Sequence, residues 1–375
     1  MENLDLVRLV REKTNTLSRM SVVTGFDGFV DELVSIVEER QDLENYKRIE
    51  TISEHGQRVL KSAGHSSLNE IVVRQVDPGG CAINMGDGLA SLGIPVTTFA
   101  TVGDPLHPAF QDYAGKAKLI SWGAEPGRTI AFEFADGKLM YSAVTQLQGF
   151  KPEALEVYLQ DQQFQQACKS ANMVAFTDWS MYPHMTACWR FLMEAVFSKL
   201  ESVPPLFFDL VDPSSRSDAD IRDMMTALGE FGKLGSVTLG LNKTEANILS
   251  RLLGCEVEDA DNPIALASQA RALREKLGIE CVVIHTNKFC AGSSSSEVGV
   301  VYGAYCENPV KSTGAGDRFN AGFTIGKLLE LDLTDCLVLA TACSGLFVTK
   351  GESGSLEEML QFIEQNDSRI TVADI

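Results

Sequence analysis

A short stretch near the C-terminus, residues 309–323, combines a bare backbone with a single acid. It reads PVKSTGAGDRFNAGF, in which Gly314, Ala315 and Gly316 have almost no side chain and Asp317 follows directly. The residues after this acid predict a helix. A helix N-terminus exposes unpaired amide donors and a partial positive charge, and small residues let an anion approach the backbone closely. The pattern therefore predicts an anion-binding turn that suits a phosphate in transfer.

The acid at this turn, Asp317, has two interpretations. On the first turn of a helix it would lie beside the bound anion, where it can take a proton from a hydroxyl that attacks phosphorus. Alternatively it only caps the helix, which is a common role for Asp. The residues alone leave both open. Other motifs are missing, because the chain has no early GxGxxG, no GK[ST] phosphate loop, no HExxH and no GxSxG at a strand-to-helix turn.

The composition is typical of a globular protein and excludes several classes. The 375 residues are 45% hydrophobic and 22% charged, with a net charge of −19 and no compensating basic run, which disfavours nucleic acid and anionic membrane surfaces as partners. We find no apolar run long enough for a membrane span and no signal-peptide layout at the N-terminus. Nine scattered cysteines without a CxxC pair favour reduced thiols. We therefore expect a cytoplasmic protein.

Short apolar runs alternate with helical stretches along most of the chain. The predicted strands are Val22–Thr24, Thr97–Val102, Met173–Thr177, Leu206–Asp209, Ser236–Leu241 and Cys281–His285. The predicted helices are Ala82–Leu92, Met185–Leu200, Asp218–Phe231, Lys243–Leu253 and Ile264–Lys276. Regular alternation of this kind predicts an α/β fold, a mostly parallel central sheet with helices on both faces.

Two segments break the alternation, at 42–78 and 119–146. The first carries mixed charge and a period-two stretch at Glu70–Val76. The second predicts a hairpin, because Asp136-Gly137 lies between the alternating segments GRTIAFEF and KLMYSAV. We expect a single domain over residues 1–375 in which these two segments form a small antiparallel β lid.

Three motifs in order resemble those of the ribokinase-like (PfkB) carbohydrate kinase family. The segment STGAGDRFNAGF at 312–323 resembles the C-terminal signature, DPGGCAINMGDGLASLG at 77–93 the N-terminal signature, and LNKTEA at 241–246 the Asn-x-x-Glu element. The resemblance covers nearly the whole chain. It implies that Asp317 is the catalytic base and that the amides of residues 314–316 form an anion hole.

The same resemblance implies how the acceptor is bound. The double glycine, Gly79 and Gly80, would approach the sugar, and Asn84 would hydrogen-bond a hydroxyl. An early acid also binds substrate in the family, and here both Asp27 and Asp31 fit its place. A sugar phosphate as acceptor stays open, because two arginines offer a phosphate clamp, namely Arg74 and Arg128.

For the donor, the resemblance implies ATP and Mg²⁺. Asn242 and Glu245 match the element that organises Mg²⁺, mostly through water. The chain departs from the family at the nucleotide-binding positions, where it has His285, Asn287 and Cys343.

Another departure lies ahead of the final signature, where Lys311 and Ser312 stand in place of Asp and Thr. In many relatives that Asp helps to hold a monovalent cation. A lysine cannot ligate a cation, so we predict activity nearly independent of K⁺.

These features predict an ATP- and Mg²⁺-dependent kinase for a hydroxyl of a monosaccharide. Two alternatives stay open: a nucleoside kinase of the same fold, and a non-catalytic sugar or nucleotide sensor. Lids of related kinases often pair between subunits, so we also expect a homodimer.

Overall fold

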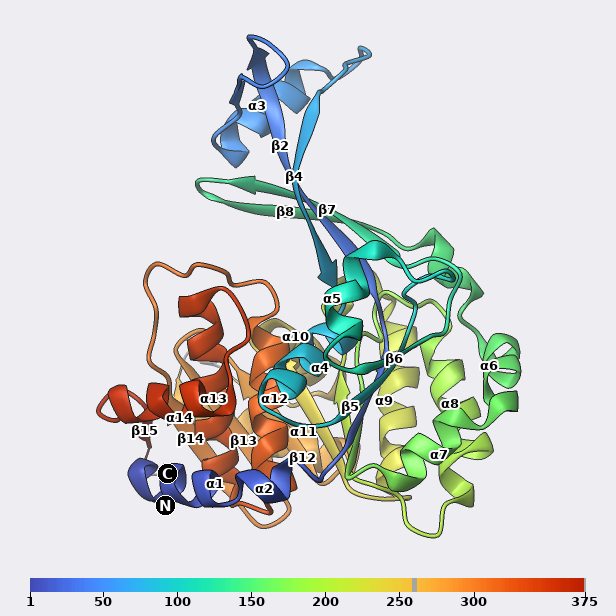
Figure 1. Cartoon of the computed structure of the whole chain (residues 1–375), viewed down its shortest axis with the longest axis vertical. Coiled ribbons are helices and arrows are strands. Elements are labelled where there is room, and N and C mark those ends of the chain that lie inside the picture. The colour runs from blue at the N-terminus through green and yellow to red at the C-terminus, as the bar shows by residue number, and fades with distance from the viewer. Residues whose placement is uncertain (258–261, 374–375) are drawn as a thin grey trace.

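The computed structural model describes residues 1–257 and 262–373, and its main feature is a large ten-stranded sheet (Figure 1). Seven neighbouring strands are parallel, and three further strands continue one edge antiparallel. In spatial order they are β6 (Lys118–Ser121), β5 (Val96–Ala100), β1 (Val22–Phe26), β9 (Met173–Phe176), β10 (Leu206–Asp209), β11 (Val237–Asn242), β12 (Cys281–His285), β13 (Phe289–Ser294), β14 (Val298–Tyr302) and β15 (Thr371–Val372).

Helices cover both faces of this sheet, because alternate strand residues point into two separate cores. Phe207 packs into one core and Phe208 into the other. The core with Phe207 includes α1 (Asn3–Glu12), α4 (Cys81–Ser91), α12 (Ala315–Leu328), α13 (Leu333–Lys350) and α14 (Leu356–Gln365). The core with Phe208 includes α6 (Pro152–Tyr158), α7 (Gln163–Ser170), α8 (Met185–Ala195), α9 (Asp218–Gly232), α10 (Lys243–Leu253) and α11 (Pro263–Leu277).

The predicted α/β class is confirmed, and the predicted strands and helices coincide with observed ones. The largest difference is in α8, which ends at Ala195 and is followed by a separate 3-10 turn at Phe197–Lys199 rather than running to Leu200. Within the described residues one helix, α13, is long and apolar enough to cross a membrane. Here it packs against α12, α14 and the β13–β14 hairpin as a core helix.

A second, smaller sheet rises from the body on long strands (Figure 1). We call it the lid sheet, and it consists of β2 (Phe29–Arg40), β3 (Tyr46–Arg48), β4 (Ile71–Gly79), β7 (Gly127–Phe134) and β8 (Gly137–Ala143). Helix α3 (Ile52–Lys61) lies at its far end. The sheet is antiparallel except where β2 pairs with β7 in parallel. Its function as a lid stays a prediction.

The limits predicted for this sheet differ from those observed. The segment 42–78 omits β2, whose acids at Asp31 and Glu32 and charged end obscured the strand pattern. The segment 119–146 begins inside β6, which belongs to the large sheet, while its hairpin at Asp136-Gly137 joins β7 and β8 as predicted.

Candidate active site

The bare turn lies at the start of α12. Gly314 is the N-cap with φ +85°, a left-handed conformation that favours glycine, and the amide of Ala315 donates to the carbonyl of Ser312 at 3.1 Å. A Cβ on Gly316 would come within 3.2 Å of the His285 ring. The turn therefore has little room for larger residues, and its backbone stays accessible to a ligand.

Asp317 follows on the first turn and is 7% exposed. Burial raises its pKa to about 8, the neighbouring carboxylates of Asp209 and Asp27 act in the same direction, and Arg318 opposes them. A carboxyl with such a pKa can take up a proton near neutral pH, which suits a general base. A hydrogen bond with the Cys81 side chain also lowers this pKa.

The acceptor side begins where β4 leads into α4. Gly80 is the N-cap of α4 with φ +99°, and Asn84 lies on its first turn. A Cβ on Gly314 would lie 3.4 Å from the Asn84 amide nitrogen, so the starts of α4 and α12 are neighbours. The double glycine, Asn84 and the anion-binding turn thus share one region, as their predicted roles require.

The structure distinguishes the two early acids. Asp27 is fully buried and accepts hydrogen bonds from the amides of Cys81 and Ala82 and from the Thr177 hydroxyl at 2.7 Å. Burial still raises its pKa, while these bonds lower it. Asp27 therefore anchors the start of α4, and its oxygens are already engaged.

Asp31 has a different environment. It lies half-buried on β2 with its carboxylate against Gly79, where a Cβ would overlap it. Its cross-strand neighbours are Asp77 on β4 and Thr129 on β7. Burial raises the pKa of Asp31, and a hydrogen bond with Thr129 lowers it. Asp31 thus lies against Gly79 and Asp27 against Gly80, and a ligand contact of either acid stays a prediction.

Arg128 lies elsewhere. It is 54% exposed and forms two hydrogen bonds to Glu32, at 3.0 and 2.7 Å. Because side chains alternate along a strand, Arg128 and Glu32 lie on the opposite face of the lid sheet from Asp31. The substrate contact of Arg128 stays a prediction, and its pairing with Glu32 does not support it. Arg74 also pairs with a lid acid, Glu133, at 2.8 Å.

The predicted metal-organising pair forms a capping box at the start of α10. The Asn242 side chain accepts from the Glu245 amide at 3.0 Å, and both Glu245 oxygens accept from Asn242, at 2.8 and 2.6 Å. Burial and then Asp209 raise the pKa of Glu245 to about 8. Among the described residues, no three His, Cys, Asp or Glu side chains are close enough to hold a metal directly. The set fits an ion that keeps its water ligands and offsets this negative charge.

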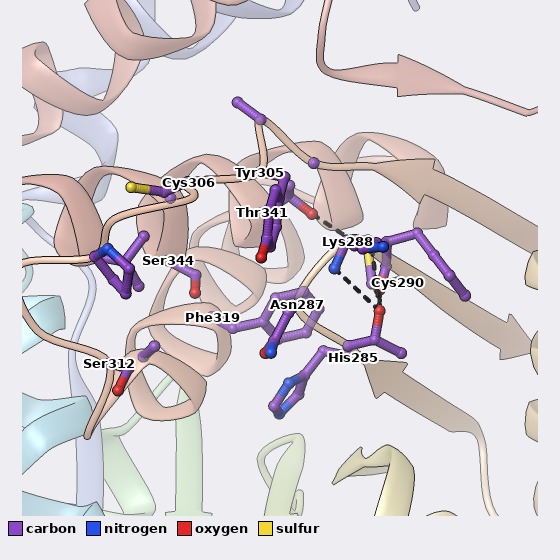
Figure 2. Close-up of a pocket in the computed structure, with 18 of the residues that line it drawn as sticks. His285, Asn287, Lys288, Cys290, Tyr305, Cys306, Ser312, Phe319, Thr341 and Ser344 are labelled. Carbon is purple, nitrogen blue, oxygen red and sulfur yellow. Dashed lines mark hydrogen bonds between the residues drawn. The ribbon is translucent and has the colours of Figure 1, made fainter. Parts of the chain in front are cut away.

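A cavity of about 320 Å³ opens on the other side of the turn (Figure 2). Its wall includes two predicted nucleotide-binding residues, His285 and Asn287, together with Ala315 and Gly316. Burial lowers the pKa of His285 to about 4, so its ring is neutral at physiological pH. Asn242 does not line this cavity and lies with Glu245 at the start of α10.

Helix α13 contributes to the cavity with residues that the sequence reasoning missed. They are Thr341, Ser344, Gly345 and Val348, whose i, i+3, i+4, i+7 spacing places them on one face. That spacing was the available signal. Cys343 faces elsewhere, since a Cβ on Gly322 of α12 would lie 2.7 Å from the Cys343 Cβ. Its nucleotide contact stays a prediction, and the structure shows Cys343 packed between α12 and α13.

A second overlooked residue, Arg318, fixes the start of α12 from behind. It is 6% exposed, pairs with Asp87 of α4 at 3.0 Å, and lies over the ring of Phe347 of α13 at 4.5 Å. Its Nε also donates to Ser353 at 3.0 Å. Arg318 thereby joins three elements at the bare turn.

Comparisons with known proteins show which family and fold this chain resembles. A family model described as prokaryotic ketohexokinase matches residues 4–366. A ketohexokinase of Haloferax volcanii is 27% identical over 344 residues, covering 91% of this chain and 90% of that protein. A ribokinase of Thermotoga maritima has a similar structure, with a TM-score of 0.62 at 16% identity over 92% of this chain and 99% of that one. An E. coli protein solved in complex with ATP and Mg²⁺ has a TM-score of 0.61 at 17% identity, with coverage of 92% and 99%.

Proposed function

Because the chain belongs to the prokaryotic ketohexokinase family of ribokinase-like carbohydrate kinases, we propose that it transfers the γ-phosphoryl group of ATP to a hydroxyl of a ketohexose. Membership makes it a phosphotransferase with an alcohol group as acceptor. The ketohexose is the proposed part, and the name of the Haloferax volcanii relative supports it.

One observation supports the proposal most strongly, namely the place of the turn at residues 314–316. One side of this turn borders the cavity that suits a nucleotide, and the other side neighbours Asn84 and the double glycine. Asp317 is buried where the two meet. A phosphoryl group in transfer has to pass between donor and acceptor at such a place.

In the proposed reaction, Asp317 takes the proton of the attacking hydroxyl. The acceptor oxygen forms a bond to the γ-phosphorus, and the bond from that phosphorus to the bridging oxygen of ADP breaks. The amides of Gly314 and Gly316 donate to the transferring group and stabilise its charge, and the amide of Ala315 joins them when it exchanges its bond to Ser312 for one to that group. Asp31, Gly79, Gly80 and Asn84 orient the sugar by hydrogen bonds and close backbone approach.

Mg²⁺ would be held near Glu245 and Asp209 through water, and when bound it neutralises charge on the nucleotide phosphates. Burial raises the pKa of both carboxyls, Asp209 adds to the shift of Glu245, and Asp27 adds to that of Asp209, so a nearby cation would favour their ionised forms. Glu245 keeps its orientation through the capping box with Asn242.

The direct test is an ADP-release assay with the purified protein, Mg-ATP and a panel of ketohexoses, aldohexoses, pentoses and adenosine. We expect the highest kcat/KM with a ketohexose. Turnover with adenosine alone would favour the nucleoside kinase alternative. Binding of sugars without any ADP release would favour the sensor.

We also propose a homodimer formed through the lid sheet. Its edge strand β4 carries three exposed apolar side chains, Ile71, Val73 and Val76, and among the described residues no strand pairs with its free edge. Light scattering should give twice the monomer mass of 40.8 kDa. Val73→Asp should return the monomer, and Leu234→Asp, at an exposed apolar residue of the body, should not.

A cytoplasmic location is part of this proposal, and the nine cysteines, all free, support it.

A further inference from the structure

Two contacts join the lid sheet to the loop that leads into the anion-binding turn. Lys311 forms an ion pair with Asp77 of β4, with Nζ 3.3 Å from the carboxylate oxygen. Lys138 of β8 donates to the hydroxyl of Thr313 at 3.2 Å. Both contacts lie within three residues of Gly314, so the lid touches the chain immediately ahead of the proposed anion hole.

The loop is fixed at its other side by the body. The amide of Val310 donates to the carbonyl of Val348 at 2.8 Å, and Val348 lines the nucleotide-side cavity on α13. Ala315 donates to Ser312 at 3.1 Å. The short segment 311–313 therefore lies between a body anchor at Val310 and the start of α12, and the lid holds it from above.

The lid residues of these contacts belong to the acceptor side. Asp77 pairs with Asp31 in the register of β2 and β4, and it lies two residues before Gly79. The positive charges of Lys138 and Lys311 both favour the ionised form of Asp31. The face of the lid sheet that carries Asp31 is thus the face that touches the loop.

We propose that Lys311 and Lys138 are positioning residues that fasten the lid to the anion-binding loop, so that a sugar held at Asp31 sets the turn for phosphoryl transfer. This inference rests on the proposed function. It gives Lys311 a partner in the lid. In this arrangement the ammonium acts through Asp77.

The two lysine contacts should favour phosphoryl transfer to the sugar over hydrolysis of ATP by water. With the lid fastened, the turn is ordered when the sugar is in place, and water is excluded. Without the contacts of Lys311 and Lys138, ATP still binds in its cavity, but the turn less often adopts the conformation that transfer to the sugar needs. The sugar-dependent rate should fall, and the share of ATP hydrolysed without sugar phosphate formation should rise.

The experiment compares three single variants in the full-length protein, namely Lys311→Met, Lys138→Met and Lys47→Met. Lys47 is the control, because its ion pair with Glu38 at 2.7 Å lies wholly within the lid sheet. For Lys311→Met and Lys138→Met we expect kcat to fall about two- to fivefold, the range for an exposed ion pair, with KM for ATP unchanged. The ratio of ADP formed to sugar phosphate formed should rise above one. Lys47→Met should match the wild type in all three measures.

A charge exchange tests the pairing itself. Asp77→Lys combined with Lys311→Asp should recover part of the kcat that each single change loses, because the pair is rebuilt with its charges reversed. Additive losses in the double variant would overturn the proposal, as would a Lys311→Met enzyme that matches Lys47→Met.

The failure of the proposed function would look different. If the wild type phosphorylates no sugar, or Asp317→Asn retains its turnover, the kinase assignment itself fails. If Asp317→Asn is inactive while the Lys311 and Lys138 variants behave as the control, only the fastening is wrong.

Discussion

Asp317 lies in surroundings that oppose its charged form. Burial and the carboxylates of Asp209 and Asp27 raise its pKa to about 8, well above the ordinary value of 3.8. The folded protein therefore binds this proton more tightly than the unfolded chain does. Its contribution to the free energy of unfolding is largest below pH 4 and falls as the pH rises towards 8. The side chain that suits a general base thus lowers the stability of the fold at neutral pH.

The change Asp317→Asn should separate these two effects. We expect turnover to fall by about two to four powers of ten, the usual loss for a general base. The free energy of unfolding at pH 8 should rise by about 1–2 kcal/mol, because an amide needs no charge at this position. Denaturant titration and the ADP-release assay measure the two. Asp112→Asn, on the surface of the body, is the control, and a variant at Asp317 with wild-type turnover would contradict the assignment.

The pH dependence should report the same carboxyl. A base with a pKa of about 8 is active when deprotonated, so kcat/KM should rise as the pH increases and level off above pH 8. Asp209→Asn removes the neighbouring charge that contributes most after burial, and the rise should move to lower pH. A rise at the same pH in both proteins would show that Asp209 does not influence the base.

At the scale of elements, α12 is held between α4 and α13 by close backbone approach. A Cβ on Gly322 would lie 2.5 Å from the Leu339 carbonyl, one on Gly326 would lie 2.7 Å from Cys336, and one on Gly88 would lie 3.0 Å from Ala321. Gly322 and Gly326 of α12 thus allow close packing, and this packing sets the position of the turn at the start of the helix.

Gly322→Val should therefore be costly. We expect a loss of about 1–3 kcal/mol in the free energy of unfolding, the range for overpacked cores, together with lower turnover. Gly56→Ala in α3 is the matched control, because nothing lies within 4 Å of a Cβ there, and it should raise stability by up to about 1 kcal/mol through helix propensity. Similar thermal denaturation curves for both variants would contradict the packing role of Gly322.

The strands that the sequence could predict are those that local residue patterns determine. Parallel strands are buried on both faces, so they appear as continuous apolar runs, and β1, β9, β10 and β12 were found in this way. β2 was missed because it carries acids along a half-exposed sheet. The environments of Asp27 and Asp31 depend on which carboxylate reaches the start of α4, a tertiary contact that the sequence could not show. The direction of Cys343 likewise depended on how α13 rotates against α12.

At the scale of the whole molecule, the lid sheet stands away from the body on β2 and β4 and touches it near the anion-binding turn (Figure 1). If the sugar binds at the lid sheet and ATP binds at the body, closure of the lid sheet would exclude the water that competes for ATP. Lid motion should then depend on ligands.

Hydrogen exchange can measure this motion. When the best sugar and a non-hydrolysable ATP analogue are added, backbone amides in β4, β7 and β8 should exchange more slowly, while those of the buried strand β10 should change little. Unchanged exchange throughout the lid sheet, under conditions where binding is saturated, would contradict the lid assignment.

The lid sheet enters the chain as two insertions, one from β2 to β4 between β1 and α4, and one from β7 to β8 after β6. Neither insertion supplies a strand to the large sheet or a residue to the two main cores, apart from Phe29 at the start of β2. Mutations in these segments can thus accumulate during evolution with little effect on the two main cores, except at Val30, which packs on the body, and at Asp77 and Lys138, which contact the loop ahead of Gly314. New acceptor preferences can arise by exchange of the insertions, because the turn at residues 314–316 and Asp317 belong to the body.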